Sequence, residues 1–163
     1  MLRVIIAGLL TCSFLAPAQS RFVQAELTTP IKTKKAKVGD PVKARTISEV
    51  KLPNDITVPA GSVLLGELRS LDPDSVSISF DAFQNGSKTT PLKLNIRAAM
   101  MPVQGKDGTR EAQRAEATTG AVIGLDGVSI KVDESGHEPT KFQSSKGELK
   151  LDKGLQLMLG VVE

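Results

Sequence analysis

Hydrophobic and polar residues alternate along most of the chain, which is the pattern of β-strands that bury one side and expose the other. The clearest run is 75–83, in which serines and Asp81 separate four apolar residues: Val76, Ile78, Phe80 and Ala82. Asn85-Gly86 follows this run, and that dipeptide accepts the positive φ angles of a tight turn. A second alternating run covers 92–97. Together these segments predict a β-hairpin with one apolar and one polar face.

Shorter alternating runs occur through the rest of the chain, with Gly, Pro and Asp between them. They cover 42–46, 63–68, 128–132, 149–151 and 155–161. Strands that recur at short intervals between turn residues are typical of all-β domains. We therefore expect a single all-β domain, built as a barrel or a sandwich of short antiparallel strands.

The segment 104–119 departs from this pattern, because no Val, Ile, Leu, Met or Phe stands between Val103 and Val122. Without apolar side chains, nothing offsets the chain entropy that docking on a core would cost. We predict that 104–119 is a mobile, polar insertion that loops out of the domain. Its basic residues Arg110 and Arg114 are candidate contacts for a partner.

The first residues have the pattern of an export signal. The apolar run Val4–Ala16 follows a basic residue and is too short for a transmembrane helix, which needs about 20 residues. Val23-Gln24-Ala25 suits a signal peptidase, so we expect cleavage after Ala25, with Ala16-Pro17-Ala18 as a competing site. These features predict a signal peptide over 1–25 and a periplasmic or extracellular domain over 26–163, with no transmembrane helix in the mature chain.

Cys12 offers an alternative, since a Cys at the end of such an apolar run is acylated in bacterial lipoproteins. The residues before it, Leu9-Leu10-Thr11, are not the small residues that normally flank a lipid-modified Cys, and apolar sequence continues beyond it. We therefore expect an exported protein, with a lipoprotein anchored through Cys12 as the alternative.

Composition narrows the possible chemistry. The chain has one Cys and one His, which excludes a disulfide framework and the usual zinc sites of four Cys or His ligands. The sequence holds no nucleophile elbow, phosphate loop or dinucleotide fingerprint. Removal of 1–25 would take away two of the 21 basic groups and none of the 18 acidic groups, which leaves a net charge of +1. We predict no catalytic residues, no cofactor and no metal site.

Four lysines form a basic cluster: Lys32, Lys34, Lys35 and Lys37. Lys32 and Lys34 would share one face of an edge strand, where lysines commonly prevent unwanted strand pairing. The same two amines are candidate contacts for phosphate or carboxylate groups of an envelope polymer or protein. We expect no nucleic-acid partner, because no aromatic residue stands among the lysines to stack a base. The sequence leaves the oligomeric state open.

Three stretches, taken together, resemble a known family. They are KVGDPVKA over 37–44, VPAGSVLLGE over 58–67 and LDKGLQL over 151–157. The middle stretch has an apolar residue, Pro-Ala-Gly-Ser and then a further Gly, and it resembles a strand entry in the C-terminal β-barrel of TrbI-like conjugal transfer proteins. The resemblance implies a barrel and a place near the outer-membrane channel of type IV secretion. It implies no catalytic residues.

The sequence therefore predicts an exported, non-catalytic β-domain that acts in envelope structure, assembly or binding. Two alternatives remain open. An exported glycan hydrolase would use carboxylates such as Asp72, Asp74 or Asp81. A carbohydrate-binding module would stack sugar rings on exposed aromatic side chains. Both kinds of protein usually rely on Trp and Tyr, and the chain contains neither.

Overall fold

Strands and one short 3-10 turn make up the regular structure of the described residues. A computed structural model describes residues 20–102, 120, 122–133, 135 and 137–162. The elements, in chain order, are β1 (Phe22–Leu27), β2 (Ile31–Lys32), β3 (Pro41–Thr46), β4 (Val50–Lys51), η1 (Pro53–Asp55), β5 (Thr57–Val58), β6 (Val63–Asp72), β7 (Ser75–Asn85), β8 (Lys88–Met100), β9 (Val122–Ile123), β10 (Val128–Lys131), β11 (Thr140–Ser144), β12 (Lys150–Leu151) and β13 (Gln156–Val161). No α-helix occurs in these ranges, so the predicted all-β class is confirmed.

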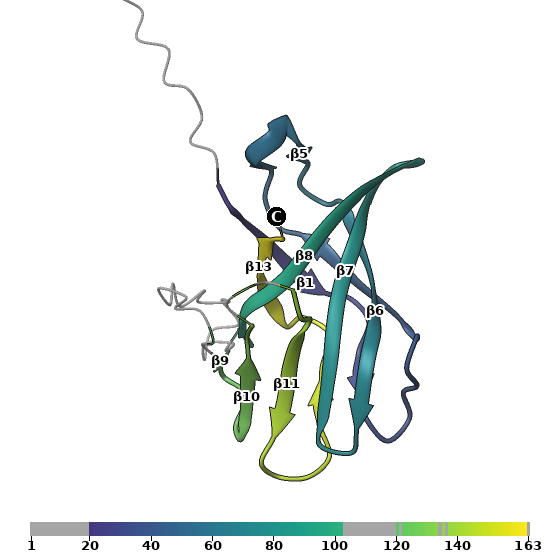
Figure 1. The fold of residues 1–163 in the computed structure, drawn as a ribbon, viewed down its shortest axis with the longest axis vertical. Helices are drawn as coiled ribbons and strands as arrows, with labels where there is room; N and C mark the ends of the chain where they lie inside the picture. The colour runs from purple at the N-terminus through teal and green to yellow at the C-terminus, as the bar shows by residue number, and fades with distance from the viewer. Residues whose placement is uncertain (1–19, 103–119, 121, 134, 136, 163) are drawn as a thin grey trace, which may run out of the picture.

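Six of these strands close into an antiparallel barrel in the order β7-β6-β3-β1-β13-β8, and pairing of β8 with β7 completes the ring (Figure 1). The sequence left barrel and sandwich open, and the closed ring selects the barrel. Two further two-stranded sheets, β2 with β12 and β4 with β5, lie outside the ring. Closure removes the exposed edges that an open sheet of this size would present.

β7 and β8 pair along only part of their length, because a third strand, β11, lies beside the first half of β7. The second half of β7 pairs with β8 from Phe80 opposite Leu94 up to the turn, whereas its first half pairs with β11. At the fork, Thr140 lies opposite Ile78 in β7, and its hydroxyl donates a hydrogen bond to the Ile96 carbonyl in β8. Thr140 therefore connects β11 to both diverging strands, to β7 through strand pairing and to β8 through its side chain.

Alternate residues of the barrel strands point into one hydrophobic core. In β1, Val23, Ala25 and Leu27 are fully buried, and the residues between them face outward. The largest fully buried side chains in the core are Phe80 and Phe142. The expected period of two thus holds in the burial of β1 and β3, whereas residues of both faces are buried over 75–80 in β7.

The alternation in β7 changes face after Phe80. Ala82, predicted to lie in the core, is only half-buried, whereas Phe83 is 5% exposed. The cause is a register shift between Phe80 and Ala82 in the pairing with β8, because one extra residue at a bulge reverses which side chains point inward. The predicted apolar face therefore continues through Phe83 rather than Ala82.

The hairpin turn lies one residue later than predicted. Asn85 pairs with Lys88, so the two central residues are Gly86 and Ser87. Gly86 has a φ of 60°, and Ser87 has no positive φ. This combination is that of a type II′ turn, which needs Gly only at its first central position.

The predicted boundary between signal peptide and domain falls inside β1, because that strand begins at Phe22. Its partners lie on both sides: β13 pairs with Phe22–Glu26 and β3 pairs with Ala25–Leu27. The predicted insertion at 104–119 lies outside the described residues.

Candidate functional site

Two lysines face each other in the small sheet formed by β2 and β12. Lys32 is the direct partner of Lys150, and the neighbouring pair, Ile31 and Leu151, is buried in the core. Directly paired residues of antiparallel strands project from the same face, so both amines extend toward solvent. Like charges in this position destabilise a sheet unless an anion lies between them.

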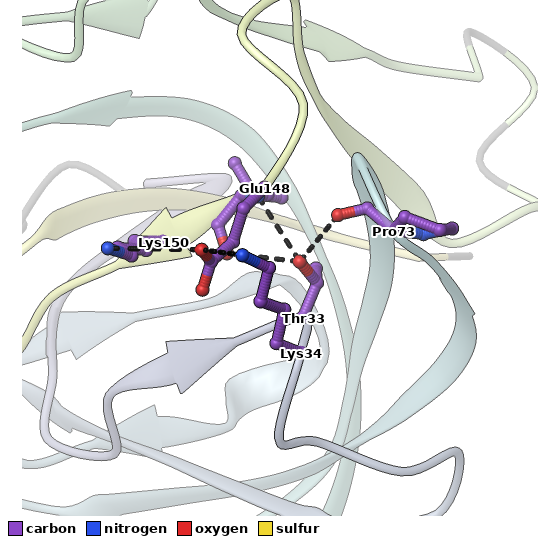
Figure 2. Close-up of polar contacts among 6 residues, drawn as sticks. Thr33, Lys34, Pro73, Glu148 and Lys150 are labelled. Carbon is purple, nitrogen blue, oxygen red and sulfur yellow. Dashed lines mark hydrogen bonds and ion pairs between the residues drawn. The ribbon is translucent and has the colours of Figure 1, made fainter.

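Glu148 supplies that negative charge. Its Oε2 atom lies 3.0 Å from the Lys34 amine and 4.0 Å from the Lys150 amine, and both ammonium groups turn toward it (Figure 2). The Glu148 side chain is 23% exposed, against 71% for Lys34 and 57% for Lys150. The Lys34 hydrogen bond is the main cause that lowers the pKa of Glu148, with smaller electrostatic contributions from Lys150 and Lys32.

A buried threonine fixes the turn that carries these lysines. Thr33 is 6% exposed, and its hydroxyl donates a 2.6 Å hydrogen bond to the Pro73 carbonyl in the β6–β7 turn (Figure 2). The Thr33 amide donates to the Leu149 carbonyl, and the Leu149 amide donates to the Thr33 hydroxyl. The residues on either side of Thr33 are Lys32 and Lys34, so this anchor holds both lysines at the same end of the barrel as Pro73.

We name Lys32, Lys34 and Lys150, with Glu148 between them, the lysine cluster. Lys34 and Lys150 share one carboxylate. Lys32 acts on it only electrostatically and makes no ion pair within the part of the chain that the structure describes. Lys35 is exposed in the same turn, where its amide donates to the Lys32 carbonyl, and Lys37 is exposed at the start of the next turn. The surface therefore carries an excess of positive charge at fixed positions.

Sequence reasoning found part of this site. It placed Lys32 and Lys34 together, and both are exposed, although β2 ends at Lys32 and Lys34 lies in the following turn. It missed Glu148 and Lys150, which lie more than a hundred residues further along the chain. It also missed Thr33. The sequence did carry a signal for this residue, because Thr33 falls on a position that the alternating pattern predicts to be buried. The other predicted contacts, Arg110 and Arg114, lie outside the described residues.

Two of the acidic residues considered for a hydrolase, Asp72 and Asp81, are far apart and already paired. Asp72 accepts hydrogen bonds from the Lys141 amine and the Ser75 hydroxyl, and these interactions lower its pKa. Asp81 forms an ion pair with Arg69 at 2.8 Å. Asp81 lies six residues beyond Ser75, the partner of Asp72, which is roughly 20 Å along an extended strand. Glycosidase carboxylates lie at most about 9.5 Å apart.

The described residues offer few groups for sugar stacking or metal binding. Phe80 and Phe142 are fully buried and Phe83 nearly so, which leaves Phe22, at 44% exposure, as the exposed aromatic residue within the described ranges. Within these ranges no three His, Cys, Asp or Glu side chains gather as metal ligands would. None of the described segments forms an apolar helix long enough to cross a membrane.

Comparison with known proteins adds no relative to this picture. The chain matches no protein-family model and no curated protein sequence.

Proposed function

We propose that this protein is an exported, non-catalytic β-barrel that acts in the envelope by binding or assembly, with the lysine cluster as its contact surface for an anionic partner. The observation that carries the proposal is the direct pairing of Lys32 with Lys150 around the single carboxylate of Glu148.

Stability alone does not account for this arrangement. Exposed ion pairs contribute about 0–1 kcal/mol, and like charges placed opposite each other cost a similar amount. Glu148 relieves the repulsion between Lys32 and Lys150 only in part, because it lies 4.0 Å from Lys150 and forms no ion pair with Lys32. A phosphate or carboxylate group from a partner would relieve the rest. The Thr33 anchor holds the lysine-bearing turn in place before a partner arrives, which lowers the entropy cost of binding.

The other parts of the proposal rest on separate observations. Export is supported by the apolar run Val4–Ala16. A non-catalytic role is supported by the separation of Asp72 from Asp81 and by their engagement with basic side chains. The likeness of the turn motifs to TrbI-like barrels supports a place in the cell envelope.

Binding to inorganic polyphosphate, measured over a range of salt concentrations, tests the contact surface. We expect salt-sensitive binding, because exposed charges are screened over about 10 Å at 0.1 M salt. A variant with Lys32, Lys34 and Lys150 changed to Gln should lose most of this affinity. The matched control changes three exposed lysines on other strands, Lys43, Lys93 and Lys131, to Gln.

The control should keep nearly the wild-type affinity at each salt concentration. Equal losses in both triple variants would mean that polyphosphate responds only to net charge, and the proposed contact surface would then be wrong.

A further inference from the structure

A groove lies between the end of the β7–β8 hairpin and the segment that joins β4 to β6. Its volume is about 300 Å³, and its lining includes Asp55, Ile56 and Pro59 on one side and Phe83, Asn85 and Lys88 on the other. In Figure 1 the hairpin end and β5 both stand at the upper end of the barrel.

This groove is remote from the lysine cluster. Thr33 binds Pro73, next to the start of β7, whereas Asn85 ends β7. Eleven residues of strand separate the two ends, which is roughly 35 Å. Binding at one place can therefore be tested without disturbing the other.

The hairpin wall is one face of a two-stranded ribbon. Phe83 is the direct partner of Thr90, and Asn85 is the direct partner of Lys88, so all four side chains project from the same face. Phe83 is 5% exposed, and Asn85 and Lys88 are exposed next to the turn. The wall thus changes from apolar at Phe83 to polar and cationic at Lys88.

The opposite wall is held by buried anchors and carries the negative charge. Leu52 and Val58 are fully buried, and the Leu52 amide donates to the Ile56 carbonyl, which closes the short loop. Asp55, at the tip of this loop, has a φ of 57°, a left-handed conformation uncommon for residues other than Gly. Strained backbone of this kind is concentrated at ligand sites, and here it places an exposed carboxylate on the groove. This carboxylate lies 3.7 Å from the Lys51 amine, so a peptide ammonium group would take the place of an exposed ion pair.

We propose that this groove binds a short peptide with free termini. The Lys88 amine receives the peptide carboxylate, and the Asp55 carboxylate receives the peptide ammonium group. Ile56 and Pro59, which are partly exposed, provide most of the apolar surface for one side chain, since Phe83 is only 5% exposed. The Asn85 amide can both donate to and accept from the peptide backbone. The volume is at the lower limit for small-ligand pockets, about 300 Å³, so the peptide has two or three residues.

Titration of the ¹⁵N-labelled full protein with the dipeptide alanyl-leucine tests the proposal. We expect saturable amide shifts that are concentrated in 55–59 and 83–90. Lys88→Gln and Asp55→Asn should each weaken binding about tenfold or more, because each removes a hydrogen bond between charged groups. Lys93→Gln, an exposed change on β8 outside the groove, should leave the affinity unchanged.

Two blocked peptides separate terminal recognition from other binding. N-acetyl-alanyl-leucine and alanyl-leucine amide should each bind about tenfold more weakly than the free dipeptide. Equal binding of the free and blocked dipeptides would overturn the proposal. Binding of an eight-residue peptide without binding of the dipeptide would also overturn it, because the groove would then receive an internal segment of a protein.

Discussion

Val23 in β1 lies directly opposite Leu159 in β13, and both side chains are fully buried. The same strand pairs on its other side with β3, beginning at Ala25 opposite Thr46. A chain that began at Glu26 would keep only the last two residues of β1. It would lose Val23 and Ala25 from the core and would open the barrel between β13 and β3.

The first prediction concerns the position at which the proposed signal peptide is cleaved. We expect cleavage after Ala18, the competing site, because this leaves β1 intact, and the mature chain should begin at Gln19. Mass spectrometry of the exported protein measures this directly. Deletion of 19–25 should destabilise the barrel by at least about 2 kcal/mol, since burial of one Val side chain alone contributes about that much. A stable exported protein that begins at Glu26 would contradict the prediction.

The second prediction concerns Gly66, where β6 shifts register against β7. A Cβ atom at this position would lie 2.2 Å from the Ser79 carbonyl oxygen and 2.8 Å from Cδ1 of Phe80. We expect Gly66→Ala to lower the free energy of unfolding by about 3 kcal/mol, because backbone and a buried ring would have to move.

Chemical denaturation measures this loss, and Gly39→Ala is the control. Gly39 has a φ of 89° but open space around its missing side chain, so only backbone strain of about 1–2 kcal/mol is expected there. Equal losses in the two variants would show that close packing at Gly66 has no particular effect.

The third prediction compares the two faces of β7. Ile78→Asp should be severely destabilising, by about 4 kcal/mol or more, because it places an unpaired charge in the core. Alternation alone predicts little cost for Ser77→Asp, but Ser77 is 6% exposed and its hydroxyl lies 2.9 Å from that of Ser70. We therefore expect an intermediate loss of about 1–3 kcal/mol for Ser77→Asp. Lys93→Asp, on an exposed position of β8, should cost less than either, and thermal unfolding of the three variants tests this order.

These serines show how far local pattern predicts the fold. The period of two depends only on neighbouring residues, so it predicted the strands and most of the core. The outer face of β7 is covered by contacts from distant residues, such as the hydrogen bond from Arg69 to Ser79, and no local pattern encodes them. Local pattern also does not encode the bulge that brings Phe83 inward, because the bulge depends on how β7 pairs with β8.

For the candidate site too, the sequence predicted only the part that depends on neighbouring residues. The lysines near residue 32 were visible as a run in the sequence, whereas Glu148 and Lys150 join them only because β12 pairs with β2. Pairing between segments so far apart depends on closure of the whole barrel. The sequence therefore predicted the positive charge but not the carboxylate that partly neutralises it.

The fourth prediction concerns acid stability at the β10–β11 loop. Asp133 accepts hydrogen bonds from the Ser135 hydroxyl and from the backbone amides of Ser135, His137 and Glu138. These bonds lower the pKa of Asp133 from 3.8 to about 2, with the Ser135 hydroxyl as the largest cause. Since the folded pKa lies below the usual value, the stabilisation is complete above pH 3.8 and is lost as the pH falls toward 2.

Asp133→Asn removes this titration. We expect the variant to be less stable than the wild type at pH 6, and the difference between them should shrink as the pH approaches 2. Urea unfolding at several pH values measures the difference. A constant difference across this range would show that the charge of Asp133 contributes nothing.

The last prediction concerns Glu148, which forms ion pairs with Lys34 and Lys150 and would compete with the proposed anionic partner for their amines. Glu148→Gln keeps the side-chain size but removes the negative charge, so Lys34 and Lys150 lose their shared counter-ion. We expect this variant to bind polyphosphate roughly 3–10-fold more tightly than the wild type, because a binding phosphate no longer has to displace a carboxylate. Asp152→Asn, which removes an exposed negative charge in the turn after β12, is the matched control for the change in net charge, and it should raise the affinity far less.

If Glu148→Gln binds more weakly, Glu148 holds the lysines in their binding positions rather than competing with the partner. Equal gains in the two variants would mean that polyphosphate binding reports net charge and not the geometry of the lysine cluster.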